Sequence, residues 1–402
     1  MLNKVSLMIL SLAVLSACGK TKTADSLLPS ENSTCEGVAI KTSFIVEYED
    51  GTTANVKYAS KEELRDEFVE PNLEKIKRIE YDQKFELKND FSARAVSSIN
   101  NWGYESTNVE QLWQAGHRGA GIVVAVIDSG VDVNHVNLVN QIHVNAGEIA
   151  GNGIDDDGNG YVDDVTGYDF FDNDNTPNDQ LDHGTHVAGV IAAEHSNDVV
   201  ENEVVLSMAP SAKIMPLKFL GTGGGTLSAA IEAIDYAVDN GAKIINASWG
   251  GPGCSTILRN RVAGLAQEGV LFVAASGNSG SNIDNFPEYP AAFSGTEQLT
   301  VGSITQFGGM SSFSNYSDQL VHIFAPGTGI VSTTPDDDLH EMSGTSMATP
   351  FVAGAAAAIW SANPTWSMSQ VRDVILQSIT VNNRYRNMTQ GRLDLSQSLQ
   401  FL

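Results

Sequence analysis

The chain of 402 residues is 42% hydrophobic and contains 37 glycines, which is enough for one large domain and a small one. It carries 23 lysines and arginines against 49 aspartates and glutamates, and its formal net charge is −26 at pH 7. Such a charge repels nucleic acids and anionic lipid surfaces, so we expect no nucleic-acid partner. The same charge favours the binding of cations.

The first residues are typical of an export signal. A single early lysine precedes an apolar run over residues 5–14, which is too short to span a bilayer stably. The run ends in Leu-Ser-Ala-Cys at 15–18, which resembles the lipobox of bacterial lipoproteins. The resemblance implies a lipoprotein signal peptide over 1–17 and a lipid on Cys18. That lipid would anchor the protein to the bacterial cell envelope, in the periplasm, at the outer membrane or on the cell surface. The alternative is an ordinary leader followed by an incidental cysteine.

Residues 18–41 follow the leader and consist mainly of small and polar residues. We expect them to form a polar tether that packs against nothing. Two further cysteines are present, Cys35 in the tether and Cys254 far along the chain. Export makes a disulfide possible, but this large separation gives no sign that the two are close. We therefore expect no specific bond between them.

Residues 42–90 have the pattern of a small α+β module. Strands are predicted over 44–48 and 54–58 around a tight turn, and a capping-box pattern from Ser60 predicts a helix to about Val69. Pro71 is expected to end this helix, and 73–79 and 84–87 are further strand candidates. Residues 91–101 are polar and without periodicity, so they are predicted to be a linker.

The remaining residues, 102–402, alternate between apolar strands and amphipathic helices. Residues 121–127 form an apolar, β-branched run typical of a buried parallel strand, and comparable strands are predicted at 214–218, 243–247 and 270–274. This alternation predicts an α/β fold, a three-layer sandwich around a mostly parallel central sheet. Functional sites in such folds lie at the carboxyl ends of the strands.

Ser346 lies where a loop becomes a helix. Pro350 follows it and is expected in the first helical turn, and the alanine-rich run after Pro350 strongly favours a helix. The unpaired N–H groups of a helix N-terminus would stabilise a negative oxygen formed beside the hydroxyl. A serine that merely caps the helix is the alternative.

Three other polar residues follow predicted strands or begin a predicted helix. Asp128 directly follows the strand over 121–127, where it can orient another group or cap a turn. His183 stands at the entry to a small-residue helix, where its ring can act as a base. His186 lies three residues further on, a spacing that also suits metal ligands, although no third ligand is near in sequence and a buried structural histidine is the better interpretation. Asn278 follows the strand over 270–274 and can donate to an oxyanion or form a glycine-rich turn.

Four sequence motifs contain these residues, and they follow one another along the chain. They are Val-Ile-Asp-Ser-Gly at 126–130, His-Gly-Thr-His-Val-Ala-Gly at 183–189, Ala-Ser-Gly-Asn at 275–278 and Gly-Thr-Ser-Met-Ala-Thr-Pro at 344–350. Together they resemble the signatures of the subtilisin-like serine proteases over roughly residues 102–395. The order Asp, His, Ser differs from that of the α/β-hydrolase esterases, which also require Gly-x-Ser-x-Gly.

The resemblance implies a role for each of these residues. Ser346 would attack the scissile carbonyl, His183 would transfer the proton, and Asp128 would orient the imidazole. Asn278 and the Ser346 N–H would bind the oxyanion. An extended peptide or protein substrate would lie between two segments that include the residues Gly223, Gly224 and Gly225 and the residues Ser248, Trp249 and Gly250.

The resemblance also concerns the N-terminal module. Residues 42–90 resemble an inhibitory propeptide that occupies the substrate cleft and assists folding, and a permanent interaction domain is the alternative. Residues 91–101 would then contain the processing site of a self-processing zymogen. Cleavage there would separate the peptidase domain from Cys18. The mature enzyme would then be released, or it would be held by non-covalent binding of the propeptide or by a Cys35–Cys254 bridge, which we do not expect.

The acidic loop at 155–166 indicates a cation site. Its oxygens stand at positions one, three, five and nine of an EF-hand-like loop, with glycine at position six, although threonine replaces the usual glutamate at position twelve. We therefore predict structural calcium and no organic cofactor. An acidic, solvated loop is the alternative. The predicted ligands are Asp155, Asp157, Asn159, the carbonyl of Tyr161, and Asp163.

The sequence thus predicts a secreted, lipid-anchored serine endopeptidase. A catalytically silent binding or adhesion protein on the same fold is the rival, but it predicts a damaged set of catalytic residues, which the sequence does not have. The resemblance also implies that Trp249 would form part of the wall of the primary pocket, which takes the substrate side chain before the cleaved bond, and that Glu288, before Tyr-Pro-Ala at 289–291, would lie near its base. This favours basic side chains in the substrate.

Overall fold

The structure is a computed structural model, and it describes residues 22–30, 37–86, 94–96, 99–195 and 205–402. Within these residues the largest sheet has nine strands, and seven of its eight strand pairs are parallel. Its strands, in spatial order, are β16 (Ile379–Val381), β17 (Gly391–Leu393), β13 (Ile323–Pro326), β12 (Gln298–Ile304), β11 (Leu271–Ala275), β10 (Ile244–Ala247), β5 (Val123–Asp128), β7 (Lys213–Lys218) and β6 (Tyr168–Asp169).

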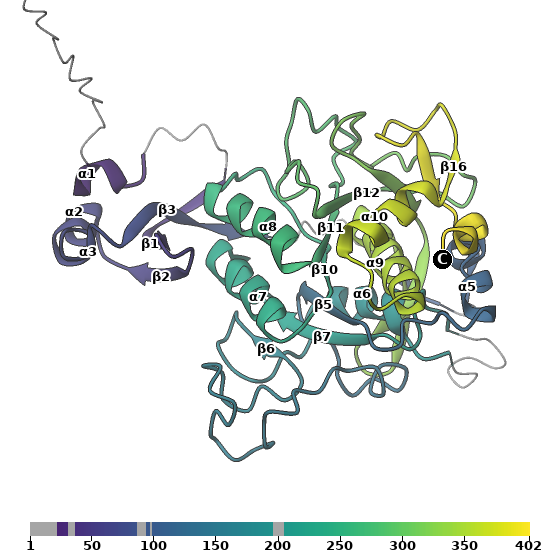
Figure 1. Cartoon of the computed structure of the whole chain (residues 1–402), viewed down its shortest axis with the longest axis horizontal. Coiled ribbons are helices and arrows are strands. Elements are labelled where there is room, and N and C mark those ends of the chain that lie inside the picture. The colour runs from purple at the N-terminus through teal and green to yellow at the C-terminus, as the bar shows by residue number, and fades with distance from the viewer. Residues whose placement is uncertain (1–21, 31–36, 87–93, 97–98, 196–204) are drawn as a thin grey trace, which may run out of the picture.

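Helices cover both faces of this sheet (Figure 1). One hydrophobic cluster joins the sheet to α6 (His183–Ala192), α9 (Thr345–Ala362) and α10 (Met368–Gln377). A second cluster joins the opposite face to α7 (Leu227–Asp239) and α8 (Thr256–Glu268). The predicted three-layer α/β sandwich is therefore confirmed. The periphery adds α4 (Trp102–Thr107), α5 (Glu110–Gln114) and the 3₁₀ helix η2 (Leu395–Gln400).

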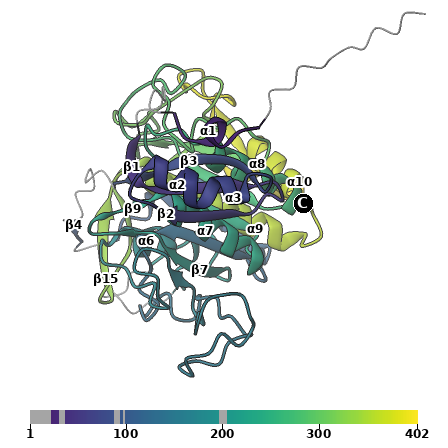
Figure 2. The ribbon, with the colours of Figure 1, turned by 90° about the vertical axis from the view of Figure 1, so that its left-hand side faces the viewer.

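The N-terminal module is a hairpin of β1 (Val38–Tyr48) and β2 (Thr53–Lys57) with a third strand, β3 (Ile76–Phe85). The elements α2 (Lys61–Leu64), η1 (Arg65–Val69) and α3 (Glu70–Asn72) cross the outer face of these strands (Figure 2). The helical region thus continues past Pro71, because proline is tolerated in a first helical turn and here begins a new short helix. The strands predicted at 73–79 and 84–87 both fall on β3, which runs without a break over Ile76–Phe85.

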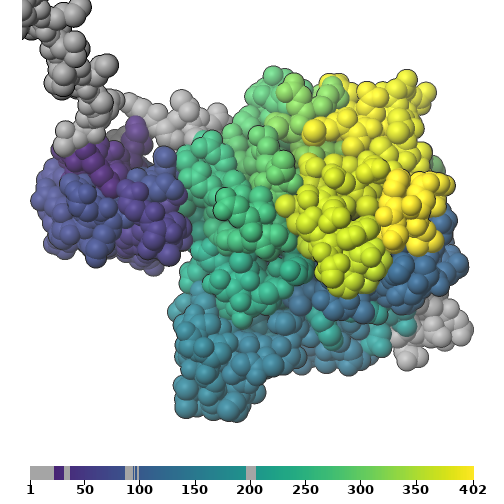
Figure 3. Space-filling view, viewed as in Figure 1, coloured from purple at the N-terminus to yellow at the C-terminus, as the bar shows by residue number. Residues whose placement is uncertain are grey.

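The module and the peptidase domain share a sheet. In the described residues its five strands run in the order β2-β1-β3-β9-β8, with β8 (Leu220–Gly221) and β9 (Gly224–Thr226) supplied by the large domain. Strand β3 pairs antiparallel with β9, and Phe85 lies opposite Gly225. The space-filling view shows the module as a separate lobe against the large domain (Figure 3). Strand pairing therefore holds the two together.

The described residues also form a smaller sheet of three strands. It consists of β14 (Ile330–Thr334), β15 (Asp338–Met342) and β4 (Arg94–Ala95), paired in that order. Strand β4 comes from the predicted linker over 91–101 and pairs with β15 through Ala95 and His340. The linker is therefore attached to the peptidase domain at this point.

The region predicted as a tether differs from that expectation. The short helix α1 (Ala24–Leu27) begins with a capping box, and Leu27 and Leu28 pack against the core of the module. The apolar side chains of these two leucines drive this docking, which a polar composition taken as a whole does not reveal. Strand β1 also begins at Val38, before the predicted start of the module. Cys18 and the leader over 1–17 lie outside the described residues.

Cys254 also differs from expectation, because it is disulfide-bonded. The prediction that it has no specific bond is therefore wrong. Cys254 lies where the module docks, since its carbonyl accepts from the Gln83 amide at 2.9 Å, and sequence separation cannot indicate such a contact. Within the described residues, none of the helices combines the length and the apolar character needed to cross a membrane.

Candidate active site

Asp128 and His183 form a buried pair. Asp128 ends strand β5 and His183 begins helix α6, so a strand end and a helix start bring them together. The His183 Nδ1 atom lies 2.7 Å from Asp128 Oδ1, and both side chains are at most 1% exposed. The Ser129 N–H also donates to Asp128 Oδ1 at 2.7 Å. This hydrogen bond fixes the carboxylate, and the carboxylate in turn fixes the imidazole.

The electrostatics of the pair favour a basic imidazole. Burial by itself would lower the pKa of His183, but the charge and the hydrogen bond of Asp128, together with the charge of Asp179, raise that pKa above its ordinary value of 6.5. Because Nδ1 faces Asp128, Nε2 is the ring nitrogen that can exchange a proton with a substrate or a nucleophile.

Ser346 is the second residue of helix α9 and is 4% exposed. Its hydroxyl donates to the Ser248 carbonyl at 3.0 Å, and its carbonyl accepts from Ser248 Oγ at 2.8 Å. Pro350 is the sixth residue of the helix, so the expectation that it lies in the first turn is wrong. Its missing N–H would have paired with the Ser346 carbonyl, and Ser248 replaces that donor.

Asn278 is held beside the start of the same helix. Its Oδ1 accepts from Thr345 N at 2.8 Å and from Thr345 Oγ1 at 2.9 Å, and Thr345 Oγ1 also accepts from Gly277 N at 3.1 Å. With the oxygen fixed in this way, the amide nitrogen is the group left to donate. The structure therefore brings Asn278 and Ser346 to one pocket, which both residues line.

One of the two predicted substrate segments, Ser248, Trp249 and Gly250, lines the pocket that contains Ser346. The residues of the other segment are not among those that line the pocket. Gly224 and Gly225 belong to β9, which pairs with β3, and Gly223 directly precedes β9.

A Cβ added at Gly224 would lie 2.2 Å from the Phe85 carbonyl, so this close backbone pairing requires glycine.

The module's own chain occupies this region in the structure. The ring of Phe85 makes edge contacts with Trp249, at 5.3 Å between centroids, and with Phe219, at 6.3 Å. Phe85 and Glu86 both line the pocket that contains Ser346 and Asn278. The extended end of β3 thus lies where a substrate strand is predicted to bind.

Glu288 lines the same pocket, as expected from the sequence. Its Oε1 accepts from Ser279 Oγ at 3.0 Å, and its Oε2 lies 2.8 Å from the position that a Cβ at Gly277 would take. The carboxylate is therefore held close to the backbone that precedes Asn278.

His186 has a structural role. It is fully buried in α6, and its Nε2 donates to the Ile330 carbonyl at 2.9 Å, with the His340 carbonyl 3.2 Å away. Burial lowers its pKa to about 3, so it is neutral at physiological pH. The interpretation of His186 as a buried, hydrogen-bonded structural histidine is confirmed.

A network of hydrogen bonds around Asp179, next to the Asp128–His183 pair, was not identified from the sequence. Asp179 is buried, accepts from Ser129 Oγ at 2.8 Å and from Thr185 Oγ1 at 2.7 Å, and burial raises its pKa to about 6. Ser129 Oγ also accepts from Gly184 N at 2.9 Å. Asp179 thereby connects the start of α6 to the end of β5. An acidic residue in a polar loop carries no pattern that would have revealed this.

The acidic loop brings together a different set of residues from the predicted one. Asp157 lies with Glu148 and Asp164, and the three offer carboxylate oxygens within 4.8 Å of one another. Glu148 was missed because it precedes the EF-hand-like pattern. Its oxygens accept from the N–H groups of Asp156 and Asp163, at 2.8 and 3.0 Å, so it closes the loop onto itself.

The other predicted ligands are engaged within the loop. Asp155 accepts from the N–H groups of Gly158 at 2.7 Å and Gly160 at 2.9 Å. Asp163 accepts from Gly153 N at 2.9 Å. Asn159 accepts from Tyr161 N at 2.8 Å, so the backbone at Tyr161 stays beside the cluster.

Comparison with known proteins identifies the fold and the chemistry. The Subtilase family profile matches residues 119–395, well over half of the chain. The chain belongs to the subtilase family. It is similar to subtilisin DY of Bacillus licheniformis, with 35% identity over 69% of this chain and 91% of that one, and to subtilisin Savinase of Lederbergia lenta, with 36% identity over the same shares. It is therefore a subtilisin-like serine endopeptidase, a protease that hydrolyses peptide bonds.

Two further similarities agree with this assignment. The chain is 38% identical to the thermophilic serine proteinase of Bacillus sp. (strain AK1), matching 65% of this subtilase and 57% of that protein. The crystal structure of a cold adapted subtilisin-like serine proteinase superposes with a TM-score of 0.57 and 33% identity, over 69% of this chain and 89% of that one. The matched regions leave the N-terminal module largely outside the family profile, which begins at residue 119.

Proposed function

We propose that the protein is an exported, lipid-anchored subtilase made as a self-processing zymogen, in which Asp128, His183 and Ser346 carry out the hydrolysis. The 2.7 Å contact between Asp128 Oδ1 and His183 Nδ1 supports His183 as the residue that transfers the proton and Asp128 as the residue that orients it. Ser346 supports the role of nucleophile because it lies at the N-terminus of the buried helix α9. The assignment follows the roles of the Asp-His-Ser triad.

The proposed reaction begins with a rotation of the Ser346 hydroxyl away from the Ser248 carbonyl, to which it donates at 3.0 Å. His183 Nε2 then takes the proton as Ser346 Oγ attacks the scissile carbonyl. Asp128 stabilises the imidazolium and keeps Nδ1 protonated. His183 returns the proton to the leaving amine, and water hydrolyses the acyl-enzyme by the same steps.

The oxyanion of each tetrahedral intermediate is proposed to lie between two donors. One is the Ser346 N–H, which has no carbonyl four residues earlier within the helix to bond with. The other is the Asn278 side-chain amide, whose oxygen is held by Thr345 at 2.8 Å. Donors fixed before the reaction stabilise the developing charge without the cost of reorganisation.

A peptide substrate is proposed to bind as an extended strand. The antiparallel pairing of Phe85 with Gly225 supports this, because it shows that β9 accepts an extended chain. Gly223, Gly224 and Gly225 would form one side of the substrate site, and Ser248, Trp249 and Gly250 the other. Such strand addition is a common way to bind peptides irrespective of most of their side chains.

The zymogen proposal rests on how the module is attached. Phe85 lines the pocket from the end of β3, and Arg94 is paired with Glu341 in β15, which ends shortly before Ser346. Strand pairing thus holds the uncut chain at Phe85 and again at Arg94. We place the processed bond between Glu86 and Arg94, at the amino-terminal side of the linker proposed over 91–101. The 42–90 module would remain bound as an inhibitor after cleavage.

The observation that carries the proposal is the hydrogen bond between Asp128 and His183 in the domain that contains Ser346. The test is a Ser346→Ala variant assayed for casein hydrolysis and, on denaturing gels, for separation of the N-terminal module. Both should be lost. A Ser312→Ala variant, which changes an exposed serine, should retain both. Persistence of hydrolysis and processing in Ser346→Ala would refute the mechanism.

A structural calcium ion is proposed in the loop over 145–164. The three clustered carboxylates of Glu148, Asp157 and Asp164 fit a hard dication, because oxygens of like charge within 4.8 Å of one another repel unless a cation lies between them. Asp155, Asn159, Asp163 and the Tyr161 carbonyl remain the further ligand candidates. Calcium would hold this long loop without taking part in the reaction.

Isothermal titration with calcium tests this site in the Ser346→Ala protein, which cannot digest itself. An Asp157→Asn variant should lose the uptake, while the exposed control Asp373→Asn should bind as the parent does. Uptake that is the same in the parent and in Asp157→Asn would exclude the proposed site.

Glu288 is proposed to favour a basic side chain on the substrate residue before the cleaved bond. The support is its position in the pocket that holds Ser346 and Asn278, where a carboxylate can pair with lysine or arginine. A peptide library assayed with the parent and with Glu288→Gln tests the proposal. The parent should prefer peptides with lysine or arginine before the cleaved bond, and the variant should lose that preference. Acceptance of large apolar residues alone by the parent would contradict it.

Export and anchoring are proposed from the leader over 1–17 and from Cys18. Metabolic labelling with a fatty acid, compared between the parent and Cys18→Ala, tests the lipid directly. The parent should carry the label and sediment with membranes. A labelled Cys18→Ala protein would contradict the assignment of the lipidated residue.

A further inference from the structure

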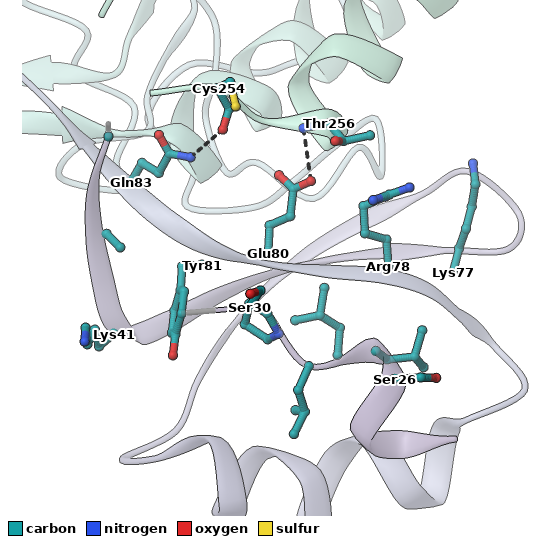
Figure 4. Close-up of a pocket in the computed structure, with 16 residues that line it drawn as sticks. Ser26, Ser30, Lys41, Lys77, Arg78, Glu80, Tyr81, Gln83, Cys254 and Thr256 are labelled. Atoms are coloured by element: carbon teal, nitrogen blue, oxygen red, sulfur yellow. Dashed lines mark hydrogen bonds between the residues drawn. The ribbon is translucent and has the colours of Figure 1, made fainter. Parts of the chain in front are cut away.

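The module and the peptidase domain also touch outside the pocket that contains Ser346. Gly37 lies directly before β1, and Gly253 lies shortly before α8. A Cβ added at Gly253 would lie 2.8 Å from the Gly37 Cα, so the two backbones are in close contact. Beside them the Gln83 amide donates to the Cys254 carbonyl at 2.9 Å, as Figure 4 shows.

Cys254 is disulfide-bonded, and the sequence contains three cysteines. Its partner within this chain is therefore Cys18 or Cys35, both outside the described residues. Cys35 is two residues from Gly37, and two residues of chain reach about 7 Å. The Cα atoms of a disulfide usually lie about 4.4–6.8 Å apart. Because Gly37 and Gly253 are in contact, the chain between Cys35 and Gly37 is long enough to permit a bond to Cys254.

Cys18 is a poor alternative for two reasons. Lys22, four residues after it, pairs with Glu49 at 2.7 Å, at the end of the module where β1 turns into β2. From there to Gln83 the strand β3 extends over seven residues, or about 23 Å. Four residues of chain reach about 14 Å, so Cys18 would reach Cys254 only with its chain fully extended and with the Lys22 and Glu49 side chains also spanning part of the way. The second reason is chemical, because a lipidated Cys18 has its sulfur in a thioether.

We propose that Cys35 and Cys254 form a disulfide that keeps the N-terminal module covalently attached to the peptidase domain after processing. The consequence for anchoring rests on the proposed function, namely on a lipid at Cys18 and on cleavage between Glu86 and Arg94. Cys35 lies on the N-terminal side of that cut and Cys254 on the other side. The disulfide is then the covalent link between the mature protease and its lipid anchor.

The bond forms by oxidation of two thiols. Each thiol loses a proton and the pair loses two electrons, which pass to an oxidised protein disulfide of the export compartment, and that disulfide becomes a dithiol. A dithiol reagent reverses the step and is itself oxidised to a cyclic disulfide. Cys254 is half-buried and lines a cavity of about 610 Å³ with Gln83 and Glu80, so a small reductant can approach it.

Peptide mapping of the Ser346→Ala protein tests the pairing without any need for processing. The protein is alkylated without reduction, digested and analysed by mass spectrometry. We expect one pair of linked peptides that contain Cys35 and Cys254, with two hydrogen atoms fewer than the separate thiols. An alkylated Cys254, or a link from Cys254 to Cys18, would overturn the proposal.

Denaturing gels of the active protein test the consequence. Without reductant the processed protein should run as one band, and with dithiothreitol it should separate into two. Cys35→Ser and Cys254→Ser should each give two bands under both conditions, and their agreement excludes a folding effect specific to one site. Two bands from the unreduced parent would refute the covalent link.

Membranes washed in urea complete the test. The mature protease should remain in the pellet in urea alone and should appear in the supernatant when dithiothreitol is added. In Cys254→Ser, urea alone should release it. A chain that stays uncut on the reducing gel would instead refute the proposed processing, and the peptide map would still decide the pairing.

Discussion

The peptidase domain and the N-terminal module build their cores in different ways. The domain has two large hydrophobic clusters, one on each face of its parallel sheet. The module has a single cluster with six buried residues, and two of the five strands in its described sheet come from the domain. A core of that size rarely stabilises a fold by itself. The module therefore depends on the domain, whereas the domain has a core that does not include the module's strands, apart from contacts with Ile45 and Phe85.

The module compensates for its small core by polar contacts with helix ends. Glu80 accepts from Ser255 Oγ at 2.6 Å and from Thr256 N at 3.0 Å, at the start of α8. Asp82 accepts from Ser228 N at 3.1 Å and from Ser228 Oγ at 2.7 Å, at the start of α7. The two carboxylates thus lie at the positive ends of two helices, where negative charge is stabilising. Separating the module leaves these helix ends without those acceptors.

The largest expected effect concerns the domain alone. Asn278→Ala should lower kcat with little change in KM, because the amide binds charge that develops only in the transition state. The expected loss is about 10²–10³-fold, a magnitude already known for the equivalent donor in subtilisin. Hydrolysis of a chromogenic peptide measures it, with the exposed Asn285→Ala as control. A rise in KM at unchanged kcat would contradict the oxyanion role.

Phe85 gives the largest expected effect at the interface. Its ring is 6% exposed and packs against Trp249 and Phe219, so its removal empties an aromatic pocket. A recombinant fragment of residues 22–86 should inhibit peptide hydrolysis when it is added to processed Cys254→Ser enzyme that has been freed of its own module. Phe85→Ala should raise the inhibition constant at least about 30-fold, which corresponds to about 2 kcal/mol for a buried aromatic anchor.

The control for this experiment is Phe307→Ala in the enzyme, since that ring is 89% exposed and distant in sequence from the strands that meet the module. It should leave inhibition unchanged. Equal inhibition by the parent fragment and by the Phe85→Ala fragment would show that the aromatic contact does not hold the module in place.

Much of the domain could be predicted from the sequence because its signals are local. The apolar run over 121–127 predicts a strand by composition alone, and β5 lies there. Asp128 ends β5 and His183 begins α6, so their pairing follows from the α/β fold, and Asn278 comes shortly after β11. The prediction that Pro350 lies in the first helical turn was wrong. Pro350 leaves the Ser346 carbonyl without its helical donor, and Ser248, a residue distant in sequence, donates to that carbonyl instead.

The remaining features depend on contacts between distant segments. Glu148 joins the acidic cluster through a loop that closes back on itself, and Asp179 supports His183 from a loop with no periodicity. Cys254 is bonded at an interface that exists only when the module docks. Sequence separation carries no information about such meetings, so these residues could not be found before the structure.

A smaller effect is expected at the helix ends. Glu80→Gln in the fragment keeps one acceptor but removes the charge at the start of α8. The inhibition constant should rise about 3–10-fold, because a helix-capping contact contributes about 1 kcal/mol. Glu74→Gln, an exposed change in the same fragment, is the control and should have no effect. A loss as large as that for Phe85→Ala would mean that charge, and not apolar burial, dominates the interface.

The smallest expected effect is the pH dependence, in which activity and stability change in opposite directions. His183 must be neutral to accept a proton, and its pKa is raised above 6.5, so kcat/KM should fall as the pH decreases through a midpoint above 6.5. The folded protein binds that proton more tightly than the unfolded chain. The stabilisation is therefore complete below pH 6.5 and is lost as the pH rises through the raised pKa.

Asp179 also contributes stability that is lost as the pH rises, but over a lower pH range than His183. Its pKa is raised from 3.8 to about 6, so the stability that it contributes is present below pH 3.8 and is lost as the pH rises through about 6. Burial lowers the pKa of His186 to about 3, so His186 adds stability as the pH rises toward 6.5 and opposes Asp179 there. Urea unfolding of the Ser346→Ala protein should therefore show stability falling with rising pH above 6.5, through the raised pKa of His183. Over the same pH range, the kcat/KM of the parent enzyme should increase. Activity and stability that rise together there would mean that the charge of Asp128 does not raise the pKa of His183.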